Sequence, residues 1–125
     1  MPWTEREIYI ADGQSGNQIL CVGSDAILRR IAGGGITTVD GAPATSSFVS
    51  TYGGISVEAA GNVYTADWYG NTIRKITTDG IIHTIGGAAQ QQGSREGCGN
   101  TLAARFYAPE DVVADPAGNV YGRTR

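Results

Sequence analysis

Carboxylates are the residues of this chain that could most directly hold a cation. Glu58, Asp111 and Asp115 lie in or beside two stretches of the same kind, so symmetric copies of them could form rings of carboxylates around an axis. His83, the one histidine, has no acid or nucleophile at a recognisable spacing, and the sequence holds no GxSxG, phosphate-loop or HExxH motif. We therefore expect a binding protein with no catalytic residue and no cofactor. The three carboxylates are secondary candidates for a metal.

Two adjacent aromatic residues are candidates for ligand binding. Trp68 and Tyr69 stand together in the stretch ADWYGN, between two segments that read as strands. Strands that alternate in direction place this link on the same face as the long glycine-rich segments, one of which carries Arg95 and Glu96. Aromatic platforms beside adaptable polar loops suit a glycan or a peptide ligand. The competing interpretation is that Trp68 packs against a neighbouring loop.

The composition is typical of a globular β protein. The chain has 125 residues, of which 41% are hydrophobic and 17% charged, and 19 glycines punctuate short apolar segments. A net charge of −3 gives no support to nucleic-acid binding, and no apolar run is long enough to cross a membrane. The start lacks a basic and apolar leader, which favours a cytoplasmic location by default. Cys21 and Cys98 form no metal pattern, and whether both are free stays open.

An internal repeat organises the chain. The segment 62–89 repeats 7–35 with an offset of 54 or 55 residues, and Gly118 to Tyr121 begin the phrase a third time. A residue that recurs at the same place in each repeat is expected to build a turn, for example by accepting backbone N–H bonds. The recurring residues are Asp12, Asp67, Asn17, Asn71, Gly61 and Gly118.

The repeat predicts units of four short antiparallel strands, called A to D. Residues 7–32 supply strands B, C and D of one unit, 54–86 supply a full unit, and 110–125 supply strand A and part of strand B of a further unit. Short links with glycine, asparagine or aspartate join the strands as a meander. Units of this kind at a period of about 55 residues predict an all-β propeller with a long loop between blades.

Two basic positions differ between the repeats. Arg74 falls on Leu20, and His83 falls on Arg29. His83 alternates with isoleucines and is expected to face solvent. Arg74 is expected either at the surface or paired with a loop carboxylate.

The segment GNVYTADWYGNTIRKITTDGIIHTIGG resembles the NHL-repeat consensus, and the linkers DGAPATSSF and ARFYAPEDVVADPAGN are similar to those of that family. The resemblance implies a six-bladed β-propeller that serves mostly as a binding scaffold. Some relatives are enzymes, so a metal-dependent hydrolase or lactonase is the alternative. The stretch Thr51 to Gly53 and the pair Gly122 and Arg123 depart from the family pattern.

The chain supplies about two blades, and a blade is apolar on both faces where it meets its neighbours. Two blades alone would therefore expose two apolar faces to water. Three copies joined head to tail would close a six-bladed ring, and we predict such a homotrimer, in which residues 110–115 of one chain pair with 7–12 of the next. The chain's own 119–122 could keep that place instead, or the chain could be a piece of a longer propeller.

Overall fold

The structure is a computed structural model that describes residues 7–13, 16–87 and 106–124. This part of the chain forms strands in three antiparallel sheets, with two single turns of 3₁₀ helix, η2 (Ala44–Ser46) and η3 (Thr51–Gly53). The all-β prediction is confirmed. Among these residues no helix is long and apolar enough to cross a membrane. The strands are β1 (Ile8–Asp12), β2 (Gln18–Val22), β3 (Leu28–Gly33), β4 (Ile55–Val57), β5 (Val63–Asp67), β6 (Thr72–Ile76), β7 (Ile82–Gly87), β8 (Asp111–Ala114) and β9 (Val120–Arg123).

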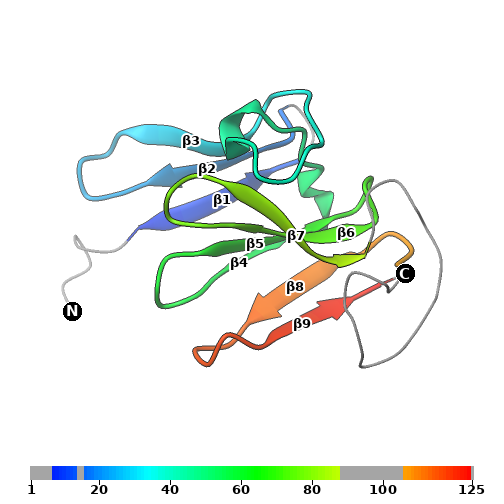
Figure 1. Cartoon of the computed structure of the whole chain (residues 1–125). Coiled ribbons are helices and arrows are strands. Elements are labelled where there is room, and N and C mark those ends of the chain that lie inside the picture. The colour runs from blue at the N-terminus through cyan, green and yellow to red at the C-terminus, as the bar shows by residue number, and fades with distance from the viewer. Residues whose placement is uncertain (1–6, 14–15, 88–105, 125) are drawn as a thin grey trace.

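The sheets follow one another in chain order and lie one above the next (Figure 1). The first sheet is β1-β2-β3, the second is β4-β5-β6-β7, and the third is the hairpin β8-β9. Each is a meander in which consecutive strands pair. The register shifts between Ile19 and Leu20 in the first sheet and between Ile73 and Arg74 in the second, the same repeat position in both. The repeat seen in the sequence therefore extends to the bulges of the sheets.

Two apolar cores separate the three sheets. Ile19 and Ala32 of the first sheet pack with Val63 and Ile76 of the second. On its other face, the second sheet packs its own apolar side chains against Val112 of the third. The second sheet is thus covered on both faces, and every residue of β5 is buried. Strands buried on both sides explain why VYTAD shows no simple alternation of apolar and polar residues.

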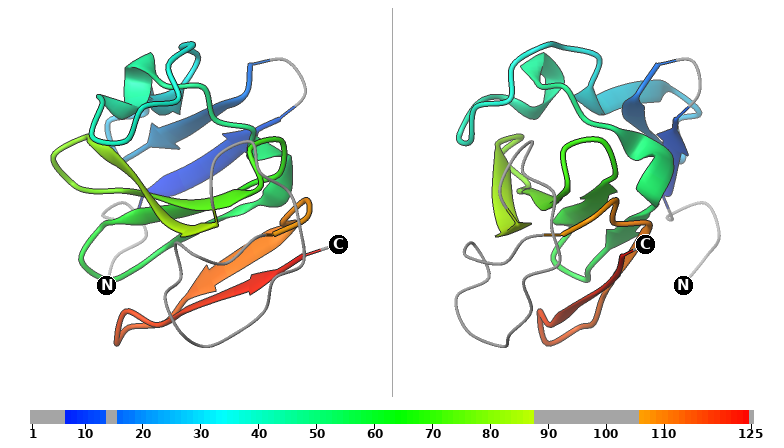
Figure 2. Two further views of the ribbon diagram at one scale, coloured as in Figure 1. Left: turned by 45° about the vertical axis from the view of Figure 1, so that its right-hand side comes forward. Right: turned by 90° about the vertical axis from the view of Figure 1, so that its right-hand side faces the viewer.

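The segment between β3 and β4 ties the first two sheets together along their outer side, which Figure 2 shows from two further directions. Backbone N–H groups of Gly41 and Ala44 donate to the carbonyls of Ile82 and Gly80, both at 2.8 Å. The carbonyl of Ala42 accepts from Ile82 at 3.1 Å. The segment therefore pairs with the start of β7, where an edge strand would otherwise offer unpaired backbone groups.

Equivalent turns open the second and third sheets. Gly61 and Gly118 have φ of 94° and 89°, and their N–H groups donate to the carbonyls of Glu58 and Asp115 at 2.9 and 3.1 Å. Glycine suits this turn because a positive φ is strained for other residues. The Asp115 carboxylate accepts from the backbone and side chain of Asn119, and these bonds lower the pKa of Asp115. These contacts occupy the carboxylate within its own turn.

Tyr64 gives a prediction about alkaline stability. Its hydroxyl donates to Glu58 Oε2 at 2.7 Å. Burial and this bond raise the pKa of Tyr64 from 10.0 to about 12. Because the folded pKa exceeds the unfolded one, the contribution of Tyr64 is complete below pH 10 and is lost as the pH rises towards 12. Between pH 10 and 12 the melting temperature should fall less steeply with pH for Tyr64→Phe than for the wild-type chain. Equal slopes would contradict the assignment.

The outer faces of the first and third sheets expose apolar side chains. Ile8 and Leu28 are 46% and 57% exposed on the first, and Val113 and Tyr121 are 56% and 61% exposed on the third. Isolated apolar residues at a surface are ordinary, but two opposite sheet faces of this kind are typical of a stack that continues.

The assembly hypothesis left open whether a second copy's residues 7–12 or the chain's own 119–122 lie beside 110–115. The structure shows the arrangement within one chain. In the structure β9 pairs with β8 from Val120 opposite Ala114 to Arg123 opposite Asp111. The short turn closed by Asp115 brings β9 back beside β8, and a local hairpin forms with little loss of chain entropy.

Candidate functional site

Four aromatic side chains gather around the β5–β6 turn, and we call them the aromatic patch: Phe48, Tyr52, Trp68 and Tyr69. The rings of Phe48 and Tyr69 meet edge to face with centroids 6.0 Å apart, and those of Tyr52 and Trp68 do so at 6.1 Å. Tyr52 and Tyr69 are 61% and 59% exposed, whereas Phe48 and Trp68 are half-buried. Each of the two pairs therefore joins one exposed tyrosine ring to one half-buried aromatic ring.

Asp67 shapes the turn that carries Trp68 and Tyr69. It is 3% exposed, and its Oδ1 accepts from the backbone N–H of Gly70 at 3.0 Å and of Ser50 at 3.3 Å. A methyl group on Gly70 would lie 2.7 Å from Asp67 Oδ2, so only glycine fits there without a shift. Asn71 follows with φ of 59° and accepts from the N–H of Ala108 at 2.9 Å. These contacts are those expected of residues that build a turn.

A buried arginine lies beneath the turn. Arg74 is 2% exposed; its Nη1 lies 3.7 Å from Asp67 Oδ2, and its Nη2 lies 3.4 Å from Asp40 Oδ1. The same Asp40 oxygen accepts from the N–H and hydroxyl of Thr84 at 2.9 and 2.8 Å. Burial raises the pKa of Asp67, while the backbone bonds and the Arg74 charge oppose that rise. Of the two expectations for Arg74, pairing with a loop carboxylate is the one observed.

The chain before β4 places Tyr52 against the turn. The hydroxyl of Thr51 donates to the carbonyl of Asp12 at 2.9 Å, which anchors η3 to the first sheet. A methyl group on Gly53 would lie 2.3 Å from the carbonyl oxygen of Ala66 and 2.7 Å from that of Pro109. Glycine at 53 therefore lets η3 approach β5 closely.

The remaining predicted site residues are either outside the described part of the chain or at separate places within it. Arg95 and Glu96 lie outside the described residues, as does Cys98. The metal candidates are separate: Glu58 accepts from Tyr64 and Asn62 in its turn, Asp115 does so from Asn119, and Asp111 is exposed at the start of β8. The part of the chain that the structure describes contains no group of three His, Cys, Asp or Glu that could hold a metal ion.

Sequence reasoning missed Phe48, Tyr52 and Asp40. All three come from the segment between β3 and β4, which the sequence predicts to be a linker between blades. Phe48 and Tyr52 lie five residues and one residue before Gly53, and the sequence shows that both are aromatic. It does not show which turn they contact. Cys21 is buried and free, as a small apolar residue in an inner strand position would be.

No protein-family model matches the chain, and no curated protein matches it. The NHL resemblance is therefore not confirmed. Solved structures do match. Over 93% of its length the chain is similar to a structural genomics protein of unknown function from Bacteroides thetaiotaomicron, with a TM-score of 0.76 and 24% identity, and covers 29% of that chain. Over 80% it is similar to an auxiliary nutrient binding protein from the same organism, with a TM-score of 0.61 and 21% identity, and covers 28% of that chain. The chain thus spans less than a third of either protein and shares the fold of that part.

Proposed function

We propose that this chain is a non-enzymatic binding module built on a β-propeller scaffold, and that the aromatic patch binds a glycan or a peptide. The observation that carries the proposal is the exposure of two tyrosine rings, each of which packs edge to face on a half-buried aromatic ring. The description of one similar structure as a nutrient binding protein supports it at the level of the fold.

The physical case rests on the rigidity of the patch. Tyrosine and tryptophan offer large contact area with few torsions to immobilise, so little entropy is lost on binding. The C–H face of a sugar ring, or an apolar peptide side chain, can stack on such rings while its polar groups reach the surrounding loops. Asp67 and Arg74 hold the turn from below, so the rings are fixed before a ligand arrives.

The hydrolase alternative needs acidic ligands directed at a common metal. The Glu58 carboxylate instead accepts a hydrogen bond from Tyr64, and the Asp115 carboxylate accepts one from Asn119. Their contacts support a structural role and favour the binding proposal.

A glycan array and a peptide array, probed with the labelled chain, test the proposal. The structure offers matched variants: Tyr69→Ala in the patch and Tyr121→Ala on the third sheet, whose side chains are 59% and 61% exposed. We expect signals that Tyr69→Ala loses and Tyr121→Ala keeps. Signals lost equally by both variants, or by neither, would count against the patch.

We further propose that the three sheets are consecutive blades and that copies of the chain assemble as a homotrimer. The exposed apolar faces of the first and third sheets support it. To close six sheets, β8 and β9 of one copy must share a blade with the next copy's first sheet, and either β9 or that copy's β1 must yield its place.

The mass in solution tests the assembly. Light scattering should report about three times the 13.0 kDa chain mass, and deletion of residues 110–125 should abolish the larger species. A monodisperse species of one chain mass would refute the homotrimer while leaving the aromatic patch untouched.

A further inference from the structure

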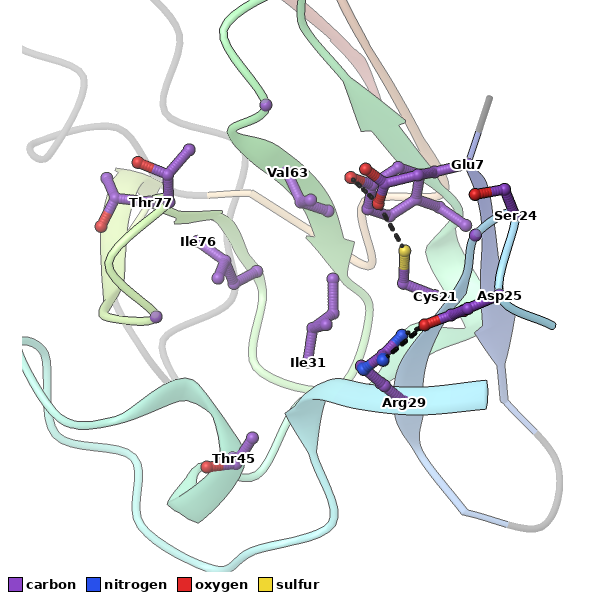
Figure 3. Close-up of a pocket in the computed structure, with 15 residues that line it drawn as sticks. Glu7, Cys21, Ser24, Asp25, Arg29, Ile31, Thr45, Val63, Ile76 and Thr77 are labelled. Carbon is purple, nitrogen blue, oxygen red and sulfur yellow. Dashed lines mark hydrogen bonds and ion pairs between the residues drawn. The ribbon is translucent and has the colours of Figure 1, made fainter. Parts of the chain in front are cut away.

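A cleft of about 750 Å³ lies between the first and second sheets, within the size range of small-molecule sites. It is bordered by the β2–β3 and β6–β7 turns, so it opens on the opposite side from the β5–β6 turn and the aromatic patch. Ile31, Val63 and Ile76 form an apolar floor, and polar side chains stand around them (Figure 3). The cleft has no part in the proposed function.

A carboxylate dominates one wall of the cleft. Glu7 Oε2 accepts from the Cys21 thiol at 2.9 Å and from the Tyr9 hydroxyl at 3.3 Å (Figure 3). Next to it, Arg29 and Asp25 form an ion pair at 2.7 Å and neutralise each other. Among the described residues no cation lies within ion-pair distance of Glu7. The three charged side chains of the wall, Glu7, Asp25 and Arg29, therefore leave it with a net negative charge.

The second repeat shows what such a wall accommodates. There Tyr64 is paired across the strands with Lys75, as Tyr9 is with Cys21. The Lys75 Nζ lies 5.6 Å from the centre of the Tyr64 ring, and the Tyr64 hydroxyl donates to Glu58. Hydrogen bonds from Tyr64 and Asn62 lower the pKa of Glu58, and the Lys75 charge lowers it further. A tyrosine face and a glutamate thus share an ammonium group in this repeat.

In the first repeat Tyr9 also donates to a glutamate, Glu7, although this glutamate lies two residues before the tyrosine and does not directly follow a preceding strand as Glu58 does. The residue paired with this tyrosine is Cys21, which is shorter than lysine and neutral. Burial and the bond to Glu7 raise the pKa of Cys21 from 9.0 to about 11, so the thiol keeps its proton at neutral pH and supplies no charge. The position that the chain fills with its own ammonium in the second repeat is open to a ligand in the first.

We propose that this cleft binds an alkylammonium group, with the cation between Glu7 and the Tyr9 ring and the alkyl stem along Ile31, Val63 and Ile76. Two sources carry this chemistry: a free aliphatic amine and the lysine side chain of a peptide. The carboxylate selects the charge, and the apolar floor selects an unbranched stem several carbons long.

Calorimetric titration of the chain at low salt tests the inference with three probes. These are 1,5-diaminopentane, Nα-acetyl-lysine methylamide and Nα-acetyl-norleucine methylamide, which lacks the ammonium. We expect binding of one or both amines and none of the norleucine compound. Tighter binding of the lysine compound would identify a peptide source, and tighter binding of the diamine a free amine. Binding of the norleucine compound as tightly as its lysine counterpart, or of no probe, would overturn the inference.

Two variants locate the site. Glu7→Gln should weaken amine binding roughly tenfold or more, because a hydrogen bond to a charged group is replaced by one to a neutral amide. Cys21→Lys should remove binding by placing the chain's own ammonium in the cleft. Glu110→Gln is the matched control, because it makes the same change at a glutamate outside the cleft, whose ion pair is with the exposed Arg123. This variant should bind the amines as the wild type does. Because Cys21 is buried, Glu7→Gln decides the matter if Cys21→Lys does not fold. Unchanged binding by Glu7→Gln would overturn the inference.

Discussion

Replacement of Arg74 by methionine is expected to lower the free energy of unfolding of the chain by about 3–5 kcal/mol. Arg74 is 2% exposed and stands between Asp67, which is equally buried, and the loop residue Asp40. Without the guanidinium the Asp67 carboxylate is left buried beside an apolar side chain. A loss of this size is a large share of the stability of a small domain. Urea unfolding followed by circular dichroism measures it.

Two further variants separate the charge from the packing. The double change Arg74→Met with Asp67→Asn removes the stranded carboxylate and should recover part of the lost stability, since asparagine can still accept the backbone bonds of Ser50 and Gly70. Arg29→Met breaks a pair whose side chains are 55% and 45% exposed, and should cost at most about 1 kcal/mol. Equal losses for Arg29→Met and Arg74→Met would show that the buried network has no special weight.

The second large effect concerns ligand affinity. For a glycan or peptide found on the arrays, Trp68→Ala should weaken binding by about thirtyfold or more, as the truncation of a central aromatic residue often costs at least ~2 kcal/mol. Trp68 is half-buried against Tyr52, so its removal takes away ligand contact and also loosens a neighbouring ring. Calorimetric titration of the wild-type and variant chains gives the ratio.

A folded control is needed because Trp68 packs within the patch. Trp68→Phe keeps an aromatic ring on Tyr52 and should recover much of the affinity, whereas Tyr121→Ala on the third sheet should leave the affinity of each chain for the ligand unchanged. If Trp68→Ala keeps its secondary structure and binds as tightly as the wild-type chain, the ligand lies elsewhere.

The sequence predicted the strands well because the information for them is local. Gly61 and Gly118 mark equivalent turns, and Asn17 and Asn71 take positive φ at equivalent places, so comparison of the repeats located the hairpins. The β5–β6 turn with Trp68 and Tyr69 was predicted in this way.

What the sequence could not reveal depends on contacts between distant segments. Arg74 and Asp40 are 34 residues apart, and nothing local indicates that a strand arginine is buried. Phe48 and Tyr52 join the patch only because Thr51 and Gly53 fix the approach of η3 to β1 and β5. The proposed ammonium site is recognised only when the pairing of Cys21 with Tyr9 is compared with that of Lys75 with Tyr64.

The fluorescence of Trp68 tests the central claim most directly. The chain has two tryptophans, so Trp3→Phe leaves Trp68 as the sole reporter. Titration of this variant with a ligand from the arrays should change the emission of Trp68 and protect it from quenching by acrylamide, with the midpoint at the calorimetric dissociation constant. Emission and quenching that stay constant while calorimetry records saturable binding would show that the aromatic patch is not the binding site.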